Sequence, residues 1–177
     1  MTAPEFSRLE RIDTIGEGER EITISATAEE RAALASRFGL KSIDRLVGTF
    51  RLRRDAAGVV ARGKVVAKLV QACVVTDDPL PVSVDEPVAL RFVAGDKPEG
   101  DEIELSEDAL DTMSFDGAAI DLGEAAAETM ALALDPFPRG PNAAAVLKEA
   151  GVISEEEAKP LGALAGLASL KEKMEKQ

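Results

Sequence analysis

The sequence predicts an α+β protein: an antiparallel β-sheet, partly closed into a barrel, covered by two main helices and followed by a helical C-terminal tail. Three β-type segments, at 43–54, 59–73 and 80–93, follow one another with only short turns between them, which favours antiparallel pairing over crossover connections. Segments with helical patterns precede and follow them. Apolar residues make up 45% of the 177 residues, which suits one domain with its own core.

The first two elements have clear boundaries in the sequence. Residues 20–26 alternate between polar and apolar side chains and predict a strand. Thr27 is placed to cap a helix over residues 28–38, with Glu30 at the capping-box position and Gly39 where the helix ends.

The later elements follow from turn residues and helix signals. Residues 80–93 form the third long strand, in which Pro87 marks a bulge or an edge. Asp121 and Glu124 are placed as a capping box for a helix that ends near residue 134. We expect an α+β domain over residues 1–140, with an acidic loop at 94–118, and a helical tail over 141–177.

The hairpin between the first two long strands has only one register that keeps charges out of the core. Pairing Arg54 with Val59 across a four-residue turn puts large and small apolar residues on one face, including Phe50 opposite Gly63. A slip by one residue would bury arginines. The other face then gathers six cations from two neighbouring strands: Arg45, Arg51, Arg53, Arg62, Lys64 and Lys68.

Charge is unevenly distributed along the chain, which has a net charge of −12. Residues 37–72 hold nine basic and two acidic side chains, whereas residues 95–128 hold one basic and twelve acidic ones. Three interpretations of the six cations stay open: a solvated sheet face, a surface that binds a polyanion, or a surface covered by the acidic segment of the same chain.

Composition excludes several kinds of chemistry. The sequence has no histidine and one cysteine, so histidine-based catalysis, an intrachain disulfide and a cysteine cluster for zinc are all ruled out. The acidic segment lacks the spacing of a calcium-binding loop, and Cys73 is expected to be a buried small residue beside Val82. We therefore predict no catalytic residues, no metal site and no cofactor.

Two blocks of sequence resemble a known family. The first runs from Val70 to Pro81 and continues from Val84 to Phe92; the second starts at Ile120 and ends with Pro136-Phe137-Pro138. Together with residues 31–40, they resemble the YceD family of large ribosomal RNA subunit accumulation proteins. Many relatives carry Cys-x-x-Cys where this chain has only Cys73, so a metal or redox role does not carry over.

The resemblance implies a cytoplasmic, non-enzymatic factor in large-subunit ribosomal RNA accumulation. Our first hypothesis is that it binds this RNA, or a pre-ribosomal particle, through the six cations. The second is an adaptor that recruits a basic ribosomal protein or an RNA-processing enzyme through the acidic segment or a C-terminal leucine seam at residues 161–170. A metal-dependent hydrolase is a third and weaker hypothesis. No apolar run is long enough to span a membrane.

Overall fold

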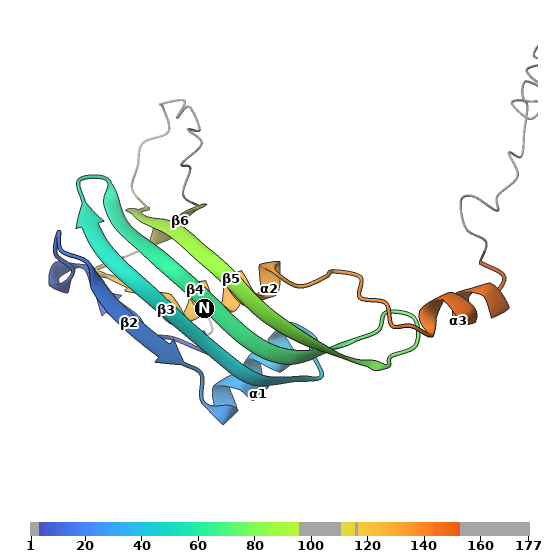
Figure 1. Ribbon diagram of the computed structural model, residues 1–177. Helices are drawn as coiled ribbons and strands as arrows, with labels where there is room; N and C mark the ends of the chain where they lie inside the picture. Colours follow the sequence, from blue (N-terminus) through green and yellow to red (C-terminus); the bar gives the residue numbers. More distant parts are fainter. Residues whose placement is uncertain (1–3, 96–110, 116, 153–177) are drawn as a thin grey trace, which may run out of the picture.

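The computed structural model describes residues 4–95, 111–115 and 117–152. A long twisted sheet of five strands, in the order β2-β3-β4-β5-β6, dominates this part of the chain (Figure 1). A second sheet has two short strands, β1 and β7. The strands of the large sheet are β2 (Arg20–Ser25), β3 (Ser42–Asp55), β4 (Gly58–Ala72), β5 (Pro79–Ala94) and β6 (Asp111–Phe115).

The predicted hairpin register is confirmed. Phe50 lies opposite Gly63 and Arg51 opposite Arg62, as the apolar pattern requires. The register shifts once, between Ile43 and Arg45, outside the stretch on which the prediction rests. Gly58 closes the turn with φ of 146°, where a Cβ atom would meet the Phe92 carbonyl oxygen. The alternation of side chains therefore sets which face of β3 and β4 is buried.

Pro87 marks an edge and not a bulge. The pairing of β4 with β5 runs without a break from Val59↔Phe92 to Ala72↔Pro79, whereas β6 pairs only with the last five residues of β5, from Leu90 to Ala94. Prolines 79, 81 and 87 all occupy alternate positions of the remaining stretch. Missing N–H groups are tolerated there because an edge strand does not need them.

Helix α1 (Ala28–Arg37) is capped as predicted. The Thr27 hydroxyl accepts a hydrogen bond from the Glu30 backbone N–H at 3.3 Å, and the Glu30 carboxylate accepts one from the Thr27 N–H at 2.7 Å. Gly39 follows the helix with φ of 63°, a conformation in which glycine is favoured. Leu34 and Ala35 join the core from this helix.

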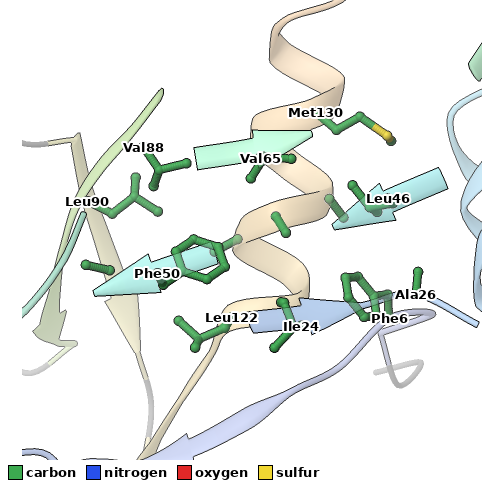
Figure 2. Packing of buried hydrophobic residues seen from close by; sticks show 14 of the residues in the cluster. Phe6, Ile24, Ala26, Leu46, Phe50, Val65, Val88, Leu90, Leu122 and Met130 are labelled. Carbon is green, nitrogen blue, oxygen red and sulfur yellow. The ribbon is translucent and has the colours of Figure 1, made fainter. Parts of the chain in front are cut away.

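Helix α2 (Leu122–Leu132) lies behind the large sheet (Figure 1) and packs on its apolar face (Figure 2). Leu122 and Met130 are fully buried beneath β3 and β4 beside Phe50 and Val65. Three consecutive alanines, at 125–127, are also fully buried. Small side chains at these positions let the helix lie close to the strands, so the core is a helix-on-sheet layer.

The sequence analysis was wrong about closure into a barrel. Within the described residues, β2 and β6 are the two edges of the large sheet and do not pair with each other. The apolar face is covered by α2 and α1 instead of by a returning strand. Strand β6 also runs parallel to β5, so the sheet is mostly antiparallel rather than entirely so.

The small sheet ties the N-terminal segment to the start of α2, and the sequence analysis missed it. Strands β1 (Leu9–Arg11) and β7 (Ala119–Asp121) pair antiparallel, with Glu10 opposite Ile120, and a short 3₁₀ turn (Ile12–Thr14) follows β1. Gly123 permits this close approach, because a Cβ atom there would lie 2.4 Å from the Phe6 carbonyl oxygen. Strands of three residues carry too little alternation to be recognised.

Part of the predicted tail is seen as α3 (Ala143–Glu149), and none of the helices in the described residues could span a membrane. The leucine seam and most of the acidic loop at 94–118 lie outside the described residues. One described piece of that loop forms β6 instead, which corrects the prediction. The predicted boundary between residues 140 and 141 stays a prediction.

Candidate nucleic-acid interface

All six predicted cations lie on one face of the large sheet, which we call the basic face. They occupy alternate positions of β3 and β4 on the side opposite α2, and each is exposed. Arg51 lies opposite Arg62 and Arg45 opposite Lys68, while Lys64 lies opposite Thr49. The structure therefore brings together the residues that sequence reasoning selected: Arg45, Arg51, Arg53, Arg62, Lys64 and Lys68.

The pairing of Arg51 with Arg62 gives no stability. Like charges directly opposite each other destabilise an antiparallel pair by about 0.2–1 kcal/mol. Within the described residues Arg51 makes one ion pair, in which its Nη1 lies 4.0 Å from Glu19 Oε2, and Arg62 makes none. Two guanidinium groups at this spacing present ten N–H donors between them for an anionic ligand.

Carboxylates border the basic face, and sequence reasoning missed them. Asp85 on β5 lies 3.5 Å from Lys64 Nζ, and Glu21 on β2 pairs with Arg51. Six cations against Glu19, Glu21 and Asp85 leave a net charge of +3 on the face. The alternation of β5 would have predicted Asp85, because side chains that share a face recur every second residue.

One end of the face is closed by a partly buried ion pair. Arg91 Nη1 donates to both carboxylate oxygens of Asp55, at 2.9 and 3.0 Å. The Arg91 guanidinium holds the pKa of Asp55 below its usual value, with help from the backbone N–H groups of the turn. Val60, which lies between Arg53 and Arg91 in register, is only 5% exposed. Arg91 is therefore engaged in the fold and is not counted with the six cations.

Part of the acidic segment lies on the other side of the sheet. Residues 119–128 form β7 and the first turns of α2, and their buried side chains contact the apolar face. Their carboxylates therefore cannot cover the basic face. Asp121 and Glu124 are engaged elsewhere, in contacts with the N-terminal segment and α1. Residues 96–110, which hold most of the acidic side chains, lie outside the described residues.

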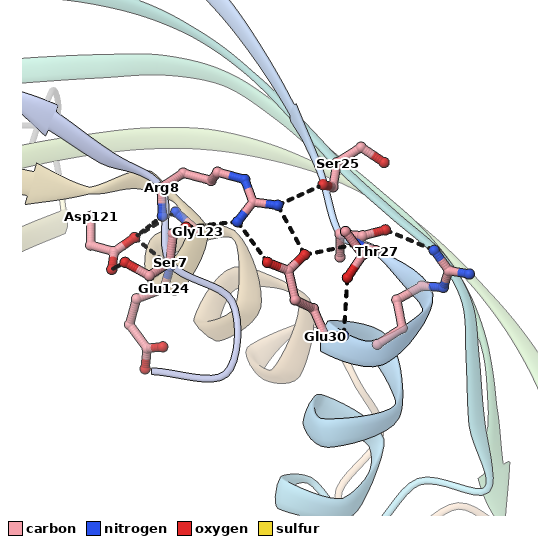
Figure 3. Close-up of polar contacts among 10 residues, drawn as sticks. Ser7, Arg8, Ser25, Thr27, Glu30, Asp121, Gly123 and Glu124 are labelled. Carbon is pink, nitrogen blue, oxygen red and sulfur yellow. Dashed lines mark hydrogen bonds and ion pairs between the residues drawn. The ribbon is translucent and has the colours of Figure 1, made fainter. Parts of the chain in front are cut away.

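The polar contacts that include Asp121 hold the N-terminal segment, α1 and α2 together (Figure 3). Arg8 donates to both carboxylate oxygens of Glu30, at 2.7 and 2.9 Å. Asp121 caps α2 by accepting from the backbone N–H groups of Gly123 and Glu124, and it also accepts from Ser7 Oγ at 2.6 Å. These side chains bond the free N–H groups at the helix ends and hold the N-terminal segment against both helices, which is a structural role.

The capping box predicted for α2 is confirmed in only one of its two halves. Asp121 is the cap, but the Glu124 carboxylate accepts two hydrogen bonds from Arg37 on α1, at 2.9 and 2.6 Å, instead of bonding back to the cap. An ion pair with a distant residue replaces the local bond because the fold brings α1 beside the start of α2.

Cys73 is buried, as predicted, but its neighbour is Gly140 and not Val82. The Gly140 N–H donates to the Cys73 Sγ at 3.3 Å, and Val82 pairs with Leu69 instead. The Gly140 N–H is the main cause that lowers the pKa of the Cys73 thiol to about 7, followed by the Thr76 hydroxyl. The thiol borders a cavity of about 740 Å³ between the β4–β5 turn and the segment after α2.

Within the described residues, no group of three or more Cys, Asp or Glu side chains lies close enough to hold a metal ion. Most of the acidic cluster that the hydrolase hypothesis requires lies outside these residues.

An open sheet that buries one face under a helix and lines the other with cations defines the class: an α+β protein that presents a cationic sheet surface. A comparison with protein-family models matches residues 61–171, more than half of the chain, to the family described as large ribosomal RNA subunit accumulation protein YceD. The chain belongs to the YceD family, which confirms the resemblance seen in the sequence. Searches among curated proteins and among solved structures gave no match.

The family match covers only half of the basic face. Arg62, Lys64 and Lys68 lie on β4 inside the matched residues, and the three arginines of β3 precede them. The membership associates the chain with the accumulation of large-subunit ribosomal RNA.

Proposed function

We propose that this protein is a non-enzymatic factor in large-subunit ribosomal RNA accumulation that binds RNA, or a pre-ribosomal particle, through the basic face. The observation that carries the proposal is the alignment of six exposed cations on two adjacent strands, with Arg51 directly opposite Arg62. The fold gains no stability from that juxtaposition. A ligand rich in phosphate would neutralise the repulsion and release its own counterions on binding.

The strands hold these cations in fixed positions before any ligand binds. The backbone of β3 and β4 is paired over the whole hairpin, and the apolar side chains between the cations are anchored in the core. Only the side chains need to become ordered on binding, which lowers the entropic penalty. The RNA partner itself is suggested by the family, whose description names the large ribosomal RNA subunit.

The proposal assigns no catalytic step to the protein. The sequence has no histidine, and the carboxylates with lowered pKa values in the described residues, such as Glu30 and Asp55, are engaged in structural ion pairs. Cytoplasmic localisation belongs to the same proposal, since large-subunit ribosomal RNA is its intended ligand.

Charge reversal of Arg51, Arg62 and Lys64 to Glu tests the proposal. We expect the triple variant to lose co-sedimentation with immature large subunits in cell extracts. The matched control reverses Arg54, Arg139 and Lys148, which are exposed and lie off the basic face. Each variant replaces three positive charges by three negative ones, so both have a net charge of −18 instead of −12.

Co-sedimentation of the basic-face variant at the wild-type level, with its fold intact by circular dichroism, would rule out this surface. Loss of co-sedimentation in both variants would show that net charge, and not the face, is decisive. Nuclease treatment before capture separates the adaptor hypothesis: contacts with a ribosomal protein or processing enzyme that survive RNA removal would favour the adaptor.

A further inference from the structure

We infer that the basic face takes double-helical RNA in preference to single strands, through phosphates and ribose hydroxyls. The inference rests on the proposed function, because it names the form of RNA that the same face binds. Three properties of the face carry it: the absence of aromatic rings, the small size of the side chains between the cations, and the length of the cationic rows.

No aromatic side chain reaches the basic face. The sequence has six phenylalanines and no Trp, Tyr or His, and all six phenylalanines lie in the described residues. Three of them, at 6, 50 and 92, are buried in the core, and Phe38 and Phe115 pack against it. Phe137 is 71% exposed but lies in the segment after α2. Proteins that hold single strands without sequence preference gain about 1–3 kcal/mol for each base stacked on such a ring.

The side chains between the cations are small and carry no amide group. Apart from Val60 and the Asp85 carboxylate, the residues between the cations in register across β3, β4 and β5 are Val47, Thr49, Val66, Ser83, Pro87 and Ala89. Asn and Gln, which read base edges through paired hydrogen bonds, are missing from the positions that β2, β3, β4 and β5 direct to this face. Hydroxyl groups are present at Thr23, Thr49 and Ser83, and double-stranded RNA is recognised mostly by shape and by 2′-hydroxyl and phosphate contacts.

The rows of cations are long enough for a duplex. Arg45 and Arg53 are eight residues apart on β3, which corresponds to about 26 Å along the strand. A double helix presents the phosphates of two strands along that length, whereas a single strand presents one set. Each contacted phosphate also releases more counterion from a duplex than from a single strand, with salt slopes of about −0.9 and −0.7 per phosphate measured on DNA.

The experiment compares one RNA in two forms with the full chain. A labelled single strand that does not fold on itself, and the same strand annealed to its complement, are titrated by fluorescence anisotropy at one salt concentration. We expect the Kd for the duplex to be lower than the Kd for the single strand by about tenfold or more. A tenfold ratio corresponds to the binding energy of one base stacked on an aromatic ring, which this face cannot offer to a single strand. Equal or tighter binding of the single strand would overturn the inference and leave the proposed function standing.

The salt dependence separates the two failures. For the duplex, Arg62→Gln should make the negative slope of log K against log salt concentration shallower by about one, because one phosphate contact is lost. The control, Arg139→Gln, should leave the slope unchanged. Failure of the wild-type chain to bind either form of RNA would overturn the proposed function together with the inference. Duplex binding with a slope unaltered by Arg62→Gln would overturn the assignment to this face.

Discussion

Arg51 and Arg62 lie directly opposite each other on β3 and β4, on the exposed face of the sheet. The pair is held there by the apolar face behind it, where Leu52 lies opposite Ala61 and Phe50 opposite Gly63. Shifting the register to separate the arginines would move those core residues into solvent. The packing of the core therefore keeps the two cations opposite each other despite their repulsion.

Removing a carboxylate from the basic face should strengthen RNA binding. Asp85 Oδ2 lies 3.5 Å from Lys64 Nζ and competes with phosphate for it. We expect Asp85→Asn to lower the Kd for RNA by about two- to fivefold, the range of an exposed ion pair. The control, Asp77→Asn, removes a carboxylate of the β4–β5 turn, which pairs with Lys41. Unchanged affinity in Asp85→Asn would mean that Lys64 does not contact RNA.

Gly63 should not tolerate a methyl group. A Cβ atom there would lie 1.8 Å from the Thr49 carbonyl oxygen, which belongs to the paired backbone and cannot move away alone. We expect Gly63→Ala to lower the free energy of unfolding by about 1–3 kcal/mol or more in urea denaturation. Gly18→Ala, where nothing lies within 4 Å of the added atom, should change stability little or raise it slightly. Equal effects of the two substitutions would contradict this account.

Acid should weaken the contact between the N-terminal segment and α1. Hydrogen bonds from Arg8, aided by the Thr27 N–H, lower the pKa of Glu30 from 4.5 to about 2. A lowered folded-state pKa stabilises the fold above pH 4.5, and this contribution is lost as the pH falls toward 2. Glu30→Gln should therefore cost about 1–2 kcal/mol at pH 7 and flatten the loss of stability between pH 5 and 2. The neighbouring exposed residue supplies the control, Glu29→Gln, which should follow the wild-type pH profile.

Alkaline pH should strengthen the packing around Cys73. Its pKa, lowered from 9.0 to about 7, means that the folded protein releases the thiol proton before the unfolded chain does. The unfolded chain then binds more protons between pH 7 and 9, so this group adds stability as the pH rises through that window. The difference in unfolding free energy between the wild type and Cys73→Ala should be larger at pH 9 than at pH 6.5. A constant difference would contradict the hydrogen bond from Gly140.

Strands β2 to β5, helix α1 and the basic face could be predicted because each rests on local periodicity. Thr27 and Glu30 form their capping box within four residues. The hairpin register follows from two strands that are consecutive in the chain and joined by one short turn. The sequence was a poor guide to contacts between distant segments. Glu124 was expected to bond back to the cap of its own helix, but its carboxylate accepts hydrogen bonds from Arg37 on α1.

By itself, the sequence determined which side chains of β3 and β4 are buried and which are exposed, because a period of two leaves only one register with an apolar interior. Only the tertiary structure decided that the sheet stays open and that α2 covers its apolar face. These depend on how separate elements pack over long chain distances, where many arrangements satisfy the same local pattern and the burial of the whole core selects one.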